Sequence, residues 1–163
     1  MDIVPGREIK RDGYEPDRFL SLYDSEAKRY FQTNIKRQID AFKDIHDNAR
    51  NIIRLLKVWK LHHQRKVMKG FILELLVIRA FRDAGDKPPS GLWPQLEMTL
   101  RYIRDHVGTA RLVDPGNSNN VVSDLILPAQ KEEIANAMRN MLNAVAAQPK
   151  RLTDFFPCHP TYR

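Results

Sequence analysis

Apolar and polar residues alternate in two different ways along the chain, and the change comes near residue 33. The beginning is extended in character: residues 3–4 are β-formers, and Asp12-Gly13 is a dipeptide typical of hairpin turns. Two or three strands bury too little surface to be stable alone. We therefore expect a short N-terminal strand and hairpin that pack on helices or on other polypeptide, with no further strand downstream.

After Thr33, apolar residues recur every three or four positions, which is the spacing of one face of a helix. Asn34 can cap the first helical segment and Asp47 or Asn48 the second, because such side chains accept hydrogen bonds from the first N–H groups of a helix. The predicted fold class is mainly α: a bundle of about five helices with a short N-terminal β strand or hairpin. The helical spacing covers residues 35–42, 52–59, 71–81, 92–103 and 129–147.

The length of 163 residues and the hydrophobic share of 42% are enough for one buried core. We expect three parts: residues 1–33 as a β segment, residues 34–148 as a helical domain and residues 149–163 as a tail. The stretch 114–120 is dense in turn residues and indicates a structured loop. Glu74 stands in an almost wholly apolar helix, and burying an unpaired carboxylate is costly. A basic side chain or backbone donors should therefore meet it.

Positive charge is concentrated on the second helical segment. The formal net charge is +7, and residues 48–73 contain no acidic residue. Arg50, Arg54 and Lys57, spaced four and three apart, align on one side of a helix. A cationic face of this kind favours a polyanion such as a nucleotide or a nucleic acid as partner.

The chain shows no sign of membrane insertion or secretion. No stretch reaches the ~18 consecutive apolar residues of a membrane span, and the N-terminus lacks the order of charged and apolar residues found in a secretory signal. Cys158 is the lone cysteine and cannot form an internal disulfide. Adjacent His62 and His63 point about 100° apart on a helix, which makes a shared zinc ion unfavourable. We expect a cytoplasmic protein that does not bind membranes.

Three separated motifs carry a resemblance to a known family. They are the stretch 54–60 (RLLKVWK), the stretch 69–76 (KGFILELL), and Asp114-Pro115 followed by the stretch 119–121 (NNV). Their order and spacing resemble the C-terminal helical half of the oligoadenylate-synthetase-like nucleotidyltransferases, a group that includes the bacterial CD-NTases of anti-phage signalling. In this family a helical lobe and a β-rich core enclose the active site, and the reaction uses Mg²⁺ and nucleoside triphosphates.

The resemblance also implies roles for particular residues. Asp2 matches the third carboxylate of the family's magnesium site, so it is the candidate catalytic and metal-binding residue. Lys57 matches a lysine that reaches the nucleotide's phosphates, with Arg54 and Lys60 as neighbouring cations on the same ligand. Phe71 matches an aromatic residue that stacks on a base. The alternatives are that Lys57 is a solvated surface lysine and Phe71 a core residue.

The sequence departs from the family at several positions. Gly70 stands where relatives often carry a small hydroxyl residue, which puts base discrimination in doubt. The sequence contains no Gly-Ser followed by Asp-x-Asp, so two of the family's three carboxylates are missing. Two-metal phosphoryl transfer needs several anionic oxygens to hold two ions about 4 Å apart. We therefore expect the chain to be inactive alone and to hold neither magnesium nor nucleotide tightly by itself.

Several interpretations of this departure stay open. The chain could be a fragment, the product of a shortened gene, or half of a split enzyme, and its partner could be a catalytic core or a second copy of itself. A different function is also compatible with the pattern: a freestanding basic helical module that binds nucleic acid or a protein, without catalysis. The product's bases and linkage, the activating signal and any downstream effector are not encoded in these motifs.

Overall fold

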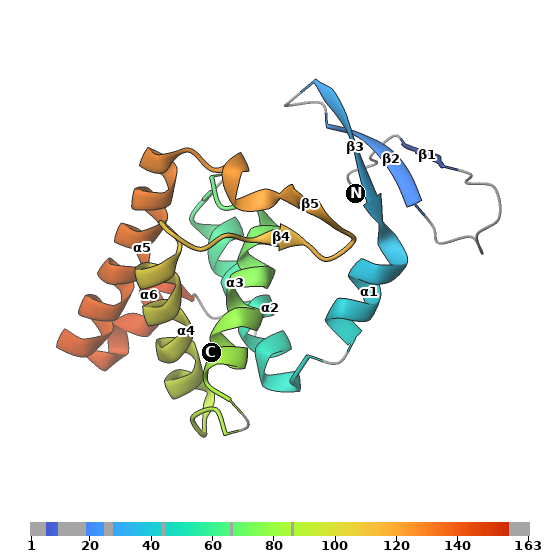
Figure 1. The fold of residues 1–163 in the computed structure, drawn as a ribbon. Coiled ribbons are helices and arrows are strands. Elements are labelled where there is room, and N and C mark those ends of the chain that lie inside the picture. Colours follow the sequence, from blue (N-terminus) through green and yellow to red (C-terminus); the bar gives the residue numbers. More distant parts are fainter. Residues whose placement is uncertain are drawn as a thin grey trace. The chain divides into compact units, whose positions relative to one another are not determined.

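The computed structural model describes residues 6–9, 19–24, 28–43, 45–65, 67–85 and 87–156 (Figure 1). Its contacts define two compact units, each built from two stretches of chain. Unit 1 comprises Met1–Ile45 and Val113–Val122, and unit 2 comprises His46–Leu112 and Ser123–Arg163. The predicted strand at residues 3–4, the Asp12-Gly13 turn, Asp2 and Cys158 lie outside the described residues.

Unit 1 begins with an antiparallel sheet in the order β1-β2-β3, as Figure 1 shows. The register places Gly6 opposite Leu22, and Phe19 opposite Asn34. Helix α1 follows β3 directly, and the side chain of Asn34 accepts a hydrogen bond from the Arg37 N–H at 2.9 Å. The predicted cap at Asn34 is thereby confirmed. The bounds are β1 Gly6–Glu8, β2 Phe19–Asp24, β3 Arg29–Asn34 and α1 Ile35–Lys43.

Residues 113–121 form a second, two-stranded sheet in unit 1, so the prediction of no strand downstream is wrong. Strand β4 (Val113–Asp114) pairs with β5 (Asn117–Val121), and Asp114 lies opposite Asn117. The stretch was predicted as a structured loop because asparagine and glycine dominate it. Those residues form a hairpin whose short strands have too few β-formers to be recognised by pattern.

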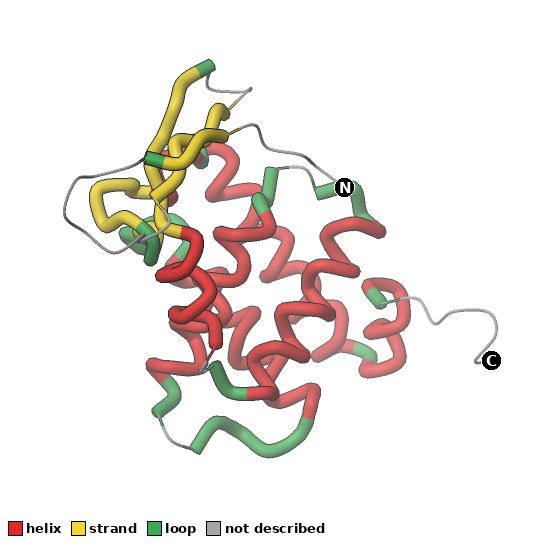
Figure 2. Tube along the Cα trace, turned by 90° about the vertical axis from the view of Figure 1, so that its right-hand side faces the viewer, coloured by secondary structure: helices red, strands yellow, loops and turns green. Residues whose placement is uncertain are grey.

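Unit 2 is a set of packed helices, drawn in red in Figure 2. Contacts join α2 to α3 and α4, α3 to α4, and α4 to α5, while α6 packs on α5. The bounds are α2 Asp47–His62, α3 Gly70–Asp83, α4 Leu92–His106, α5 Pro128–Ala147 and α6 Leu152–Phe155, with short 3-10 helices at Val122–Leu125 and Pro149–Arg151.

The start of α2 differs from the prediction. His46 is the N-cap, and its Nδ1 accepts a hydrogen bond from the Asn48 N–H at 3.1 Å. Asp47 is already helical, so neither Asp47 nor Asn48 caps the helix as predicted. Histidine is not among the residues usually favoured at an N-cap. The sequence pattern therefore placed the N-cap of α2 one or two residues after its position in the structure.

The core of unit 2 follows the predicted apolar spacing. Ile52, Leu56 and Trp59 of α2 are buried, as predicted for one side of that helix, whereas Leu55, predicted for the same side, is partly exposed. Helix α3 is apolar over residues 71–81 apart from Glu74 and Arg79, and it packs against both α2 and α4. Its buried residues are Ile72, Leu73, Leu76, Val77, Ala80 and Phe81.

The predicted fold class, mainly α with a short N-terminal β hairpin, is confirmed. The three-part division at residues 33/34 and 148/149 stays a prediction. None of the helices in the described ranges combines the length and apolar character that crossing a bilayer requires.

Candidate functional site

Lys57 of α2 and Glu74 of α3 form an ion pair between the lysine Nζ and the carboxylate Oε1. The Lys57 side chain is 48% exposed and that of Glu74 is 21% exposed. The expectation that a basic side chain meets Glu74 is therefore confirmed. The pair joins two residues that the sequence motifs single out for different reasons, one as a phosphate contact and one as a structural carboxylate.

The stem of Lys57 passes over the first turn of α3. A Cβ atom at Gly70 would lie 3.9 Å from the Lys57 Cε, which is ordinary van der Waals contact. Gly70 and Glu74 are four residues apart, so they lie on the same face of α3. A larger side chain at position 70 would therefore lie beside the end of the Lys57 side chain.

Phe71 directly follows Gly70 at the start of α3 and is partly exposed. It is neither sealed in the core nor fully solvated, unlike its neighbours Ile72 and Leu73, which are 1% and 0% exposed. The assignment of Phe71 to a base stays a prediction.

The outer face of α2 carries both cations and apolar residues. Arg54 is exposed, with its Nη1 3.5 Å from the Asn51 Oδ1, and Lys60 is partly exposed. Val58 and Leu61 on the same helix are 54% and 81% exposed. Sequence reasoning identified the cations but missed these two residues, because an apolar residue near a helical core stripe is normally assigned to the core.

Arg65, beyond the end of α2, is already engaged within unit 2. Its Nη1 lies 3.2 Å from the Glu133 Oε1, and its guanidinium lies 6.0 Å from the centre of the Trp59 ring. Both contacts hold the end of the helix against its neighbours. Arg65 therefore has contacts within unit 2, as Lys57 has with Glu74.

The two histidines at the end of α2 have structural contacts. Their ring centres are 4.8 Å apart and the rings are nearly perpendicular. The His63 Nε2 lies 3.3 Å from the Phe155 carbonyl oxygen, which attaches α6 to α2. Within the described ranges, no group of three or more His, Cys, Asp or Glu side chains could hold a metal ion. Asp2, the predicted metal ligand, lies outside these ranges.

Asp114, in unit 1, is a buried carboxylate surrounded by hydrogen-bond donors. Its Oδ1 accepts from the Gln38 amide and the Gly116 N–H, both at 2.8 Å. Its Oδ2 accepts from the Thr33 hydroxyl at 2.6 Å and the Asn120 amide at 3.1 Å. We call these five residues the Asp114 cluster. Four donors saturate the carboxylate, so the cluster joins chain segments and leaves no oxygen for a metal.

The fold is similar to that of a bacterial CD-NTase. The solved structure is CdnC of E. coli MS115-1 with ATP, which matches with a TM-score of 0.69 and 20% sequence identity over 90% of this chain. The chain spans about half of CdnC, 53% of its length. No protein-family model matches the chain, and no curated protein sequence matches it either. At this identity the comparison establishes a CD-NTase-like fold.

Proposed function

We propose that the chain is the nucleotide-gripping helical part of a nucleotidyltransferase that makes cyclic or linear oligonucleotide second messengers in anti-phage signalling, in the cytoplasm. The observation that carries the proposal is the similarity of 90% of the chain to CdnC, whose structure was determined with ATP. The half-exposed Lys57 on the outer face of α2 agrees with it.

The proposed grip consists of Lys57, Arg54, Lys60 and Phe71. An ammonium carries three N–H donors, and a guanidinium carries five, and both bind phosphate oxygens through charge-assisted hydrogen bonds. Phe71 would stack on the base, an interaction of about 1–3 kcal/mol per base. The grip binds and orients the triphosphate, while the reaction itself needs further groups.

Those groups are two magnesium ions held by three carboxylates, which in this family activate the attacking oxygen and stabilise the leaving phosphate. Asp2 is our candidate for one carboxylate. The other two are not in these 163 residues, since no Gly-Ser followed by Asp-x-Asp occurs. We therefore expect no nucleotide transfer by this chain alone, and propose that a catalytic core on other polypeptide completes the site. A second copy of the chain, the other candidate partner, lacks the same two carboxylates.

Titration of the ¹⁵N-labelled chain with ATP or GTP in the presence of magnesium tests the grip. We expect the amide signals of residues 57 and 71 to shift, and Lys57→Gln to remove the shift at residue 71 as well as the binding. Lys150→Gln is the matched control, because Lys150 is exposed and lies on a different element. Shifts confined to other residues, or equal binding by Lys57→Gln and the wild type, would contradict the proposal.

A second function is favoured by the exposed Val58 and Leu61 beside Arg54 and Lys57. A face with cations and apolar groups suits a nucleic acid or an acidic protein, and it would need no catalysis. Fluorescence anisotropy with a labelled DNA duplex separates this function from the first. Binding that falls steeply with salt and shows no preference among bases would favour it, because released counterions drive such association.

A further inference from the structure

We propose that Glu74 is a positioning residue that holds the Lys57 ammonium in place for the phosphates of a nucleotide. The inference rests on the proposed function, because it assumes that Lys57 contacts phosphate. It adds a residue that the sequence motifs indicated only as structural.

A lysine side chain is flexible, and fixing it on a ligand costs entropy. Four rotatable bonds give Lys about 2 kcal/mol of conformational entropy, part of which is lost when its ammonium is fixed on a ligand. In this protein the ammonium is already restrained by the ion pair with Glu74. A ligand therefore binds an ammonium that is already positioned, and less side-chain entropy is lost on binding.

The Lys57–Glu74 ion pair is more exposed at its lysine end. Glu74 is the more buried partner, with 21% of its side chain exposed against 48% for Lys57. An ammonium has three N–H donors, and the contact with Oε1 engages one of them. The other two are available on the more exposed side. Lys57 can therefore bind phosphate without leaving Glu74, which would otherwise remain as a partly buried, uncompensated carboxylate.

The Lys57–Glu74 pair lies near the N-terminal end of α3. The N-cap Lys69 makes no side-chain capping bond, and the first turn carries no acidic residue. The first N–H groups of a helix have no partner within the helix and favour negative charge. The first turn of α3 favours negative charge and carries no acidic residue, which suits an anion bound by the nearby Lys57 ammonium.

Isothermal titration calorimetry with the complete chain tests the proposal, using magnesium–ATP and, separately, adenosine. The variants are Lys57→Gln, Glu74→Gln and the double variant. We expect Glu74→Gln to weaken ATP binding about 5- to 10-fold, the size of typical couplings between contacting residues. Adenosine binding should not change, and Glu74→Gln should have no further effect once Lys57 is replaced.

Glu97→Gln is the matched control, because it removes a carboxylate that pairs with Arg101 on the solvent-facing side of α4. Circular dichroism of each variant reports whether the helices are intact. If the wild type does not bind ATP, or Lys57→Gln binds it normally, the proposed function fails. If Lys57→Gln weakens binding and Glu74→Gln leaves it unchanged or tightens it, the grip stands and the positioning role is overturned. A Glu74→Gln effect that persists without Lys57, or that extends to adenosine, overturns it too.

Discussion

Thr33 donates a hydrogen bond of 2.6 Å to Asp114, although 81 positions separate the two residues along the chain. Both residues are buried, at 0% and 3% exposure. In the described part of unit 1, most of the buried side chains are polar, and Val122 is the one buried apolar side chain. The Asp114 cluster therefore has a larger share in holding unit 1 together than polar groups have in unit 2.

We expect Asp114→Asn to destabilise unit 1 by about 1–3 kcal/mol. Both carboxylate oxygens accept from two donors, so the amide NH₂ of asparagine would face donors in either orientation. Amide hydrogen exchange of β3 and β5 measures the stability of unit 1 by itself. Global unfolding would not, because a chain with two units need not unfold in a single two-state transition. Asp124→Asn is the control, since Asp124 is exposed. Equal exchange in both variants would show that the cluster contributes little.

Gly116→Ala should disturb the same region for a steric reason. An added Cβ would lie 2.6 Å from the Asn34 oxygen and 2.7 Å from the Asn34 nitrogen, and backbone atoms cannot move aside cheaply. Gly108→Ala is the matched variant, because nothing lies within 4 Å of its added Cβ. We expect faster exchange in β3 and β5 for Gly116→Ala alone. A neutral result at both positions would mean that β3 and β5 separate readily.

Leu56 and Leu61 of α2 provide a matched pair for the core. Leu56 is 0% exposed and Leu61 is 81% exposed. We expect Leu56→Ala to cost about 2–5 kcal/mol through lost burial and the remaining cavity. Leu61→Ala should stay within about 0.5 kcal/mol. Chemical denaturation followed by helical circular dichroism, which reports mainly on unit 2, measures the difference. Similar midpoints for the two variants would contradict the packing described here.

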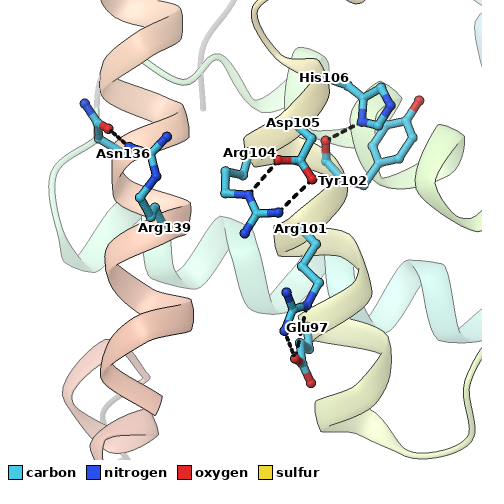
Figure 3. A network of polar contacts seen from close by, with 8 residues as sticks. All are labelled: Glu97, Arg101, Tyr102, Arg104, Asp105, His106, Asn136 and Arg139. Atoms are coloured by element: carbon cyan, nitrogen blue, oxygen red, sulfur yellow. Dashed lines mark hydrogen bonds and ion pairs between the residues drawn. The ribbon is translucent and has the colours of Figure 1, made fainter. Parts of the chain in front are cut away.

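The Arg104–Asp105 pair on α4 gives a pH-dependent prediction (Figure 3). The guanidinium donates to the two carboxylate oxygens at 2.6 and 2.8 Å. These hydrogen bonds, followed by the charges of Arg104, His106 and Arg101, lower the pKa of Asp105. Because its pKa is lower in the folded state, the pair stabilises the fold above the carboxylate's unfolded pKa. That contribution is lost as the pH falls through the folded pKa.

Arg104→Gln should raise the pKa of Asp105 toward its ordinary value, as read from the carboxyl ¹³C shift during an acid titration. Arg139→Gln is the control, because Arg139 of α5 pairs with Asn136, an uncharged partner (Figure 3). The same Asp105 titration curve in Arg104→Gln and in the wild type would show that the pair does not persist in solution.

The helices could be predicted from the sequence because their apolar spacing has a physical cause. Leu96, Leu100 and Ile103 are 2%, 0% and 0% exposed, so the periodic side chains of α4 form its buried face. Hairpin β4–β5 could not be predicted, because it depends on hydrogen bonds from Asn117 and Asn120 to the distant Gln32 carbonyl. Contacts of this kind leave no periodic signal.

The candidate site likewise combines features that the sequence predicts with features that it does not. The charge of Lys57 and the need of Glu74 for a partner follow from residue type and helical position. Their pairing with each other does not, because it depends on how α2 and α3 pack. The exposure of Val58 and Leu61 was not predicted for a related reason. Hydrophobicity along the sequence does not show which face of a helix is covered by neighbouring helices.

The discontinuous make-up of unit 1 has a consequence for synthesis of the protein. Residues 1–45 leave the ribosome well before residues 113–122, which they need to complete the unit. The Asp114 carboxylate is therefore made long after its partner Thr33, and joining them closes a long loop at an entropic cost. The nascent N-terminal strands must wait through translation of α2, α3 and α4, a period in which a chaperone or another polypeptide could engage them.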